Sequence, residues 1–171
     1  MSSQPQPAIT WREDVLPSDV AGIERLTTDS GFFRPDEVAI AAELADERLA
    51  KGPASGYHFI FAQQGGDTLG YACYGPIACT LHSWDLFWIA VRNDLRGQGL
   101  GGQIMALVEQ RVAFAGGERL YVETSSRPLY RPTRHFYQSR GYNMLAVLED
   151  FYAPGDAKMI YAKTLPVMNR R

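Results

Sequence analysis

Residues 86–110 combine an apolar run, a glycine-rich segment and a helical pattern in direct succession. The first six positions, residues 86–91, are all apolar, which predicts a strand covered on both faces. The glycine-rich segment RGQGLGG follows at residues 96–102, and apolar residues then recur at helical spacing over residues 100–112. A loop of this kind at the start of a helix presents free backbone N–H groups and the positive end of the helix dipole. The sequence therefore predicts a phosphate-binding loop at residues 96–102.

The chain before this stretch predicts a short strand, two helices and a hairpin. Helix starts are indicated at Pro17 and Pro35, where proline is followed by acidic or hydroxyl residues. Gly75 and Pro76 are expected to break the last strand of the hairpin. The expected strands lie at residues 8–12, 57–62 and 69–74.

The chain after this stretch predicts a strand, a helix and a closing pair of strands. The glycines at residues 116–117 are expected to end the central helix. A strand at residues 120–124 is joined to the central strand by that helix, so the two are expected to be parallel. A short helix at residues 132–140 and strands at residues 144–148 and 159–162 follow. This order of elements predicts a single α/β domain with a mixed sheet.

Length, composition and charge narrow the class of protein. The 171 residues with 46% hydrophobic content predict one folded domain with a sizeable core. The formal net charge of −2 gives no general attraction to nucleic acid or membranes, so a small-molecule partner is expected. No charged-then-apolar leader and no membrane-length apolar run is present, and we expect a cytoplasmic protein.

The ends of the chain, its cysteines and its histidines do not indicate a functional site. We expect residues 1–7 to form a disordered arm, residues 8–166 to form the domain, and residues 167–171 to form a C-terminal tail. Cys73 and Cys79 have no neighbouring ligand residues at zinc spacing and are interpreted as ordinary thiols. The three histidines are scattered, and no metal site is predicted.

The glycine segment admits a dinucleotide interpretation. Residues 97–102 satisfy G-x-G-x-x-G, and Glu123 follows roughly twenty residues later, at the end of the next strand. In a dinucleotide fold, however, the first glycine turns directly off the strand, whereas here residues 92–96 intervene. The roughly seventy residues that remain are too few for a second mononucleotide-binding half. A dinucleotide-dependent oxidoreductase is therefore the least favoured function.

The same residues also read as Arg96-x-x-Gly99-x-Gly101, and here the chain resembles the GCN5-related N-acetyltransferase (GNAT) superfamily. The resemblance extends to the strand at residues 120–124 and to the sequence HFYQSRGY at residues 135–142, which matches the family's distal aromatic motif in order and spacing. It implies a single-domain fold with a mixed, mostly antiparallel sheet of six to seven strands. It also implies a splayed central parallel pair and about four helices.

The resemblance implies acetyl-CoA as co-substrate. The pyrophosphate would lie on the backbone N–H groups of residues 98–102, with Arg96 shaping the loop or adding charge. The pantetheine arm would bond to the end of the central strand as an added strand does. The implied cofactor-binding residues are Ile89, Ala90, Val91, Arg96, Gly97, Gln98, Gly99, Leu100, Gly101 and Gly102.

Acetyl transfer to an amine needs a base for the amine and an acid for the departing thiolate. Tyr137 stands at the family's position for the acid, with packing by the last helix as the alternative. For the base three possibilities stay open: Asp85 at the start of the central strand, Glu123 on the next strand, or an ordered water. Tyr130 stands where many members carry an asparagine that contacts the pantetheine arm, so the chain departs from the family's pattern at this position.

The acceptor is not defined by the sequence. Aromatic residues of the first half would wall a substrate pocket or pack the core; they are Phe32, Phe33, Tyr57, Tyr74 and Trp84. The function implied is direct acetyl transfer to a primary amine of a small molecule or peptide. An acyl-CoA sensor without catalysis is the alternative, and homodimerisation is expected only from the resemblance.

Overall fold

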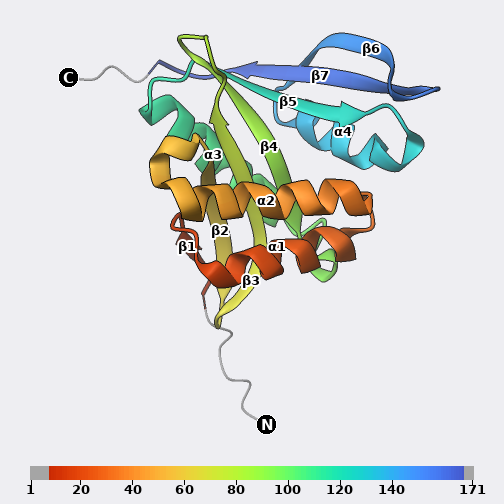
Figure 1. Ribbon diagram of the computed structural model, residues 1–171. Helices are drawn as coiled ribbons and strands as arrows, with labels where there is room; N and C mark the ends of the chain where they lie inside the picture. Colours follow the sequence, from red (N-terminus) through yellow and green to blue (C-terminus); the bar gives the residue numbers. More distant parts are fainter. Residues whose placement is uncertain (1–7, 168–171) are drawn as a thin grey trace. The chain divides into compact units, whose positions relative to one another are not determined.

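The computed structural model describes residues 8–167, and the expected arm at residues 1–7 and most of the expected tail lie outside them (Figure 1). Within the described residues seven strands form one mixed sheet in the order β1-β2-β3-β4-β5-β7-β6. The strands are β1 Thr10–Arg12, β2 His58–Gln64, β3 Asp67–Pro76, β4 Ser83–Val91, β5 Arg119–Ser125, β6 Asn143–Ala153 and β7 Asp156–Thr164. The helices are α1 Pro17–Ser30, α2 Pro35–Lys51, α3 Leu100–Phe114 and α4 Arg131–Ser139. This confirms the predicted strand and helix count.

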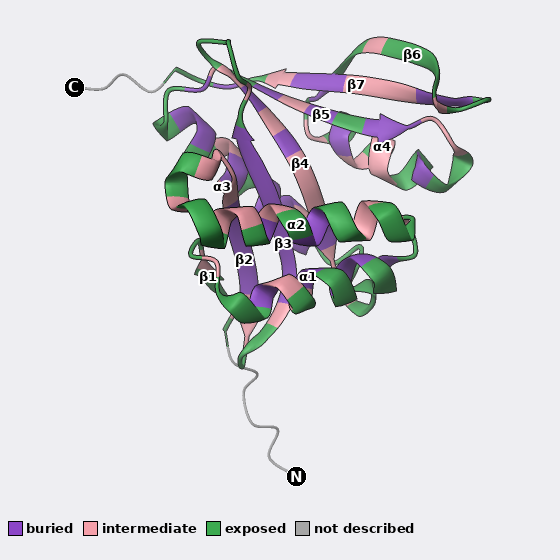
Figure 2. Ribbon diagram, viewed as in Figure 1, coloured by how far each residue is buried: buried purple, intermediate pink, exposed green. Residues whose placement is uncertain are grey.

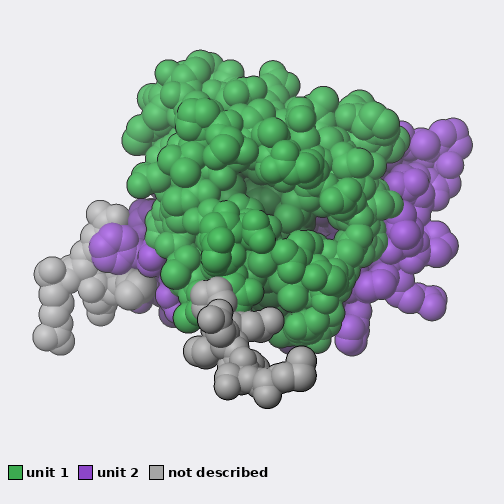
Figure 3. Space-filling view, turned by 90° about the horizontal axis from the view of Figure 1, so that it is seen from below, with its two compact units in different colours: residues 1–73, 88–107 green, residues 74–87, 108–171 purple. Residues whose placement is uncertain are grey.

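The described chain divides into two compact units, coloured separately in Figure 3. Unit 1 is built from residues up to 73 and from residues 88–107, and unit 2 from residues 74–87 and from residue 108 onward. Strands β3 and β4 and helix α3 contribute residues to both.

In unit 1 the two predicted prolines begin α1 and α2. Asp19 closes the first turn of α1 by accepting the backbone N–H of Leu16 at 2.7 Å, and the same carboxylate accepts two bonds from Arg12 at 2.7 and 2.8 Å. Asp19 is only 6% exposed, and the charge of Arg12 offsets the cost of removing its carboxylate from water. Gly31, with φ of 72°, ends α1 in the left-handed conformation.

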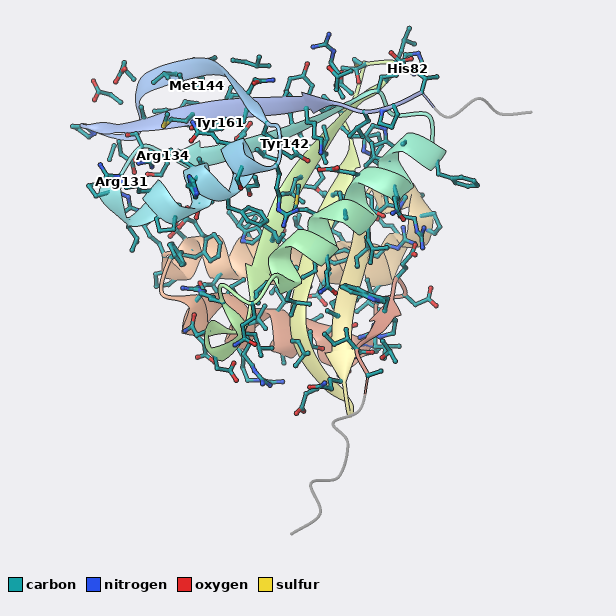
Figure 4. All side chains as sticks on the ribbon, turned by 180° about the vertical axis from the view of Figure 1, so that it is seen from behind. His82, Arg131, Arg134, Tyr142, Met144 and Tyr161 are labelled. Carbon is teal, nitrogen blue, oxygen red and sulfur yellow. The ribbon has the colours of Figure 1, made fainter. Side chains whose placement is uncertain are left out.

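The core of unit 1 lies between its helices and its strands. Helices α1 and α2 cross one face of β2 and β3 in Figure 1, and α3 lies over the other face in the rear view of Figure 4. Phe59, Phe61 and Tyr71 stack with ring centroids 5.8 to 6.4 Å apart. The predicted hairpin turn is formed by Gly65 and Gly66, whose φ values of 58° and 93° are those of a two-residue turn that matches strand twist.

In unit 2 helix α4 packs on the β5–β7 pair. These strands are antiparallel from Arg119↔Thr164 to Ser125↔Lys158. Tyr137 of α4 is 4% exposed, and its ring lies 6.5 Å from that of Tyr161 on β7. By contrast, β6 is largely exposed along its length (Figure 2). The predicted parallel pairing of β4 with β5 is confirmed.

Three sequence expectations differ from the structure. Gly75 and Pro76 do not break β3 but form its last two residues. Proline has no backbone N–H to donate to a neighbouring strand, and at the end of a strand this donor is not needed. Strand β6 does not end near residue 148 but continues to Ala153, because two register shifts absorb its irregular residues. Residues 86–91 are not covered on both faces: Leu86 and Ala90 are each 7% exposed, whereas the other four positions, Trp88 included, are only half-buried.

Gly117 allows β4 and α3 to approach within unit 2. A Cβ at this position would lie 2.4 Å from Val112 Cγ1 and 2.6 Å from Trp84 Cδ1. We predict that Gly117→Ala destabilises the fold by about 1–3 kcal/mol, because the added Cβ would overlap two buried side chains. Gly22→Ala is the matched control, since Gly22 lies inside α1 with nothing within 4 Å of its added Cβ, and it should stabilise by up to about 1 kcal/mol. Equal midpoints for both variants in urea unfolding would contradict this account.

Candidate active site

The predicted phosphate loop lies in unit 1, between β4 and α3. A short 3-10 helix, η2 (Asn93–Leu95), separates the loop from β4, so the first glycine does not turn directly off the strand as a dinucleotide site requires. Gly97 and Gly99 have φ of 73° and 87°, a conformation that costs glycine little. Gly101 and Gly102 instead lie in the first turn of α3. Two of the four glycines thus turn the chain, and the other two leave the backbone at the start of α3 without side chains.

The start of α3 fits an anionic group. Its first α-helical hydrogen bond runs from the Gln103 N–H to the Gly99 oxygen at 3.1 Å, so the N–H groups of residues 100–102 precede the helical ladder. The N–H of Gln98 donates weakly to the Leu95 oxygen at 3.4 Å. Residues 101 and 102 carry no Cβ, which lets a phosphate approach the backbone. The residues present therefore fit a pyrophosphate at this helix terminus.

Arg96 and Asn93 tie the loop to the end of α1. The Arg96 guanidinium donates to the Ser30 oxygen at 3.0 Å and lies 4.5 Å from the centroid of the Phe32 ring. The Asn93 side chain donates to the Asp29 oxygen. Arg96 thus shapes the loop through contacts with α1, one of the two roles considered for it. The sequence pattern did not indicate Asn93, because only the folded chain brings it to α1.

The parallel pair β4–β5 separates part of the way along its length. Its pairing runs from Ser83↔Arg119 to Leu86↔Val122, whereas β5 continues against β7 as far as Ser125. Beyond Leu86, β4 extends to Val91 without this ladder. This is the predicted splayed pair, and the candidate pantetheine-binding residues, Ile89 to Val91, lie past the point where the pairing ends.

Asp85 and Glu123 lie on one face of unit 2. Asp85 stands opposite Tyr121 in the β4–β5 register, and Glu123, two residues further along β5, points to the same side. Lys158 of β7 pairs with Glu123, with Nζ 2.6 Å from Oε2. Partial burial, with the negative charge of Glu123 as a second cause, raises the pKa of Asp85 to about 6, while Lys158 acts in the opposite direction.

Tyr137 lies on the other face of β5. Its ring packs against Tyr142 and Tyr161, which are labelled in Figure 4, at 5.8 and 6.5 Å. Tyr161 is the register partner of Val122, and Glu123, the next residue of β5, points to the opposite side. Burial raises the pKa of Tyr137, so its phenol stays protonated at neutral pH.

The five candidate substrate-binding aromatics have different surroundings. Tyr74 and Trp84 are both buried in unit 2 and pack together, with ring centroids 6.1 Å apart. In unit 1, Phe33 lies 6.0 Å from the Trp88 ring, and Phe32 lies beneath Arg96. Tyr57 is half-buried just before β2, and its backbone oxygen accepts a bond from Arg48 at 3.0 Å. Tyr74 and Trp84 therefore have the environment of core residues.

One further residue was not indicated by the sequence. Thr124, near the end of β5, is 5% exposed, and its hydroxyl has no hydrogen-bond partner among the described residues. A buried hydroxyl without a partner is costly, so Thr124 is a candidate for contacting a bound molecule. Threonine is common in strands, and only the missing partner distinguishes this one.

In residues 8–167 no group of three or more His, Cys, Asp or Glu side chains is arranged to hold a metal ion. None of the helices in that range is long and apolar enough to cross a membrane.

A mixed sheet with a splayed parallel pair and a glycine loop leading into a helix is the architecture of an acetyltransferase. The family model described as "Acetyltransferase (GNAT) domain" matches residues 55–144, more than half of the chain. The protein therefore belongs to the GNAT acetyltransferase family, whose members use acetyl-CoA.

Solved structures agree with this assignment. A protein from Desulfovibrio desulfuricans, assigned to the GNAT acetyltransferases, is 44% identical; the match covers 93% of this chain and 100% of that one, with a TM-score of 0.91. The ribosomal-protein-S18-alanine N-acetyltransferase of Escherichia coli shares the fold at 18% identity, with 96% and 98% coverage and a TM-score of 0.74. An aminoglycoside 6'-N-acetyltransferase complexed with coenzyme A does so at 18% identity, 96% and 99% coverage, and a TM-score of 0.72. No curated protein matches the chain.

Proposed function

We propose that the protein is an acetyl-CoA-dependent N-acetyltransferase that moves the acetyl group directly to a primary amine of a small molecule or peptide. The observation that carries this proposal is Asp85, a half-buried carboxylate with a pKa raised to about 6. A base with such a pKa is mostly ionised at neutral pH and still accepts a proton readily. Acetyl-CoA, when bound, supplies the activated thioester.

The donor is held by residues of unit 1. The N–H groups at the start of α3 bind the pyrophosphate, and Gly101 and Gly102 allow its close approach. Arg96 supports the loop from the side of α1. The edge of β4 at Ile89–Val91, beyond its pairing with β5, bonds to the pantetheine arm as an added strand would. Gly97, Gln98, Gly99 and Leu100 complete the binding loop.

The proton transfers are carried by unit 2. Asp85 takes a proton from the acceptor ammonium, and the neutral nitrogen attacks the thioester carbon, so that a C–N bond forms as the C–S bond breaks. The nitrogen then loses a second proton, which balances the proton that the departing sulfur gains. Tyr137 keeps a phenolic proton for the departing sulfur. Glu123, whose carboxylate is paired with Lys158, is the less favoured base. The base and the acid lie on opposite faces of β5.

The direct test is turnover. Purified protein with acetyl-CoA and a panel of primary amines is expected to release free thiol and to yield the acetylated amine in a mass spectrum. Binding of acetyl-CoA without acetylation of any amine or peptide would contradict the proposal and favour an acyl-CoA sensor. Acetyl-CoA, and not NADH, is expected to raise the melting temperature.

A further inference from the structure

We propose that Lys158 is a positioning residue that holds Glu123 in an ion pair and thereby leaves Asp85 as the carboxylate that takes the amine proton. This inference rests on the proposed function, in which Asp85 is the base. It concerns a residue on a third strand, β7, which no motif of the sequence indicates.

The register of three strands directs the three charges to one face. Asp85 is opposite Tyr121, and Glu123 lies two residues further along β5. Glu123 is in turn opposite Ile160 of β7, and Lys158 lies two residues from Ile160. Residues two apart in a strand point to the same side. Asp85, Glu123 and Lys158 therefore project from β4, β5 and β7 on the same side of the sheet.

Lys158 is held from two sides. Its Nζ lies 2.6 Å from Glu123 Oε2 and 4.1 Å from the centroid of the Phe151 ring. The Lys158 side chain is 15% exposed, whereas that of Glu123 is 43% exposed. Because the Lys158 side chain is confined in this way, its ammonium group has a fixed position. Lys158 therefore positions the more exposed Glu123 carboxylate.

The arrangement of Asp85, Glu123 and Lys158 determines how readily each carboxyl group ionises. Two neighbouring carboxylates each disfavour ionisation of the other. Glu123 raises the pKa of Asp85 in this way, and Lys158 lowers it. On the same side of β5 in unit 2, the Tyr121 phenol stands opposite Asp85, and the Arg119 guanidinium belongs to the residue opposite Ser83, two positions before Asp85. Since Lys158 is paired directly with Glu123, Asp85 has no ion-pair partner of its own among residues 8–167 and is free to exchange a proton.

The chain contains a matched control pair. Lys163, also on β7, has Nζ 2.8 Å from Glu109 Oε2 on α3. Its side chain is 28% exposed, and it has no role in the proposed chemistry. Lys163→Met therefore removes a comparable ion pair from the same strand. It shows how far the loss of any such ion pair changes the pH profile.

The first test compares pH profiles of kcat/KM. Lys158→Met is expected to move the acidic limb to higher pH by about one unit and to lower kcat/KM several-fold at pH 6, because Asp85 loses a stabilising positive charge. Glu123→Gln should move the acidic limb to lower pH. Lys158→Arg, which keeps the positive charge, should retain the wild-type acidic limb, and Lys163→Met should leave the limb in place. A limb that stays unchanged in Lys158→Met, or that moves equally in Lys163→Met, would overturn the inference.

The second test does not depend on turnover. The carboxyl carbon of Asp85 can be titrated by ¹³C NMR in the wild type, Lys158→Met and Glu123→Gln proteins without substrate. Opposite displacements of the Asp85 midpoint in the two variants are expected, and coincident titrations would overturn the coupling. Opposite displacements in a protein that acetylates no amine would instead reject the proposed function and leave the electrostatic coupling intact.

Discussion

Replacement of Asp85 by asparagine is expected to lower kcat/KM for acetyl transfer by about 10²- to 10⁴-fold at pH 7, the usual contribution of a positioned general base. Asparagine keeps the size and polarity of the side chain but cannot take the amine proton. In the wild type, kcat/KM should rise with pH through about 6, where Asp85 loses its own proton, and should then level off. The variant should lack this limb, as pH-dependent steady-state rates would show.

The same substitution separates a catalytic from a structural role. The pKa of Asp85 is raised from 3.8 in the unfolded reference to about 6, so the folded state binds more protons between these values. Stability therefore falls as pH rises through that window, and Asp85→Asn should raise the melting temperature at pH 7 more than at pH 4. Asp19→Asn is the contrast: its carboxylate is paired with Arg12, and its loss should lower the melting temperature at pH 7. An Asp85→Asn enzyme with the wild-type rate and pH dependence would rule out Asp85 and leave Glu123 or an ordered water as the base.

Tyr137→Phe is expected to reduce kcat by about 10²-fold while changing the Kd for acetyl-CoA by less than a few-fold. The phenol would act only when the sulfur departs, so its loss affects the chemical step and not donor binding. Pre-steady-state thiol release and calorimetric titration with coenzyme A measure the two quantities separately.

Tyr142→Phe is the matched control for this variant. Tyr142 packs on Tyr137, and its hydroxyl donates to Glu109 Oε1 at 3.0 Å. Its loss should lower stability by about 1 kcal/mol without a comparable fall in kcat. If the two variants lose kcat equally, Tyr137 acts through packing and the acid must be sought elsewhere.

The elements of this fold could be predicted because their signals are local. Proline followed by acidic residues marks the starts of α1 and α2, and two adjacent glycines mark the β2–β3 turn. Errors arose where the outcome depends on neighbouring strands. Strand β6 continues past residue 148 because β7 lies beside it, and the partial burial of several β4 residues depends on what packs against that strand.

By itself, the sequence determined the family and the place of the glycine loop, since both depend on residue order and spacing along a single stretch. Only the tertiary structure decided what surrounds each candidate residue. The pKa of Asp85 depends on burial and on Glu123 and Lys158, which reach it through the registers of β5 and β7. Arg96 reaches Ser30 only because α1 packs beside the loop. Such contacts join residues far apart in the chain, and their distances are fixed by packing, which no local pattern records.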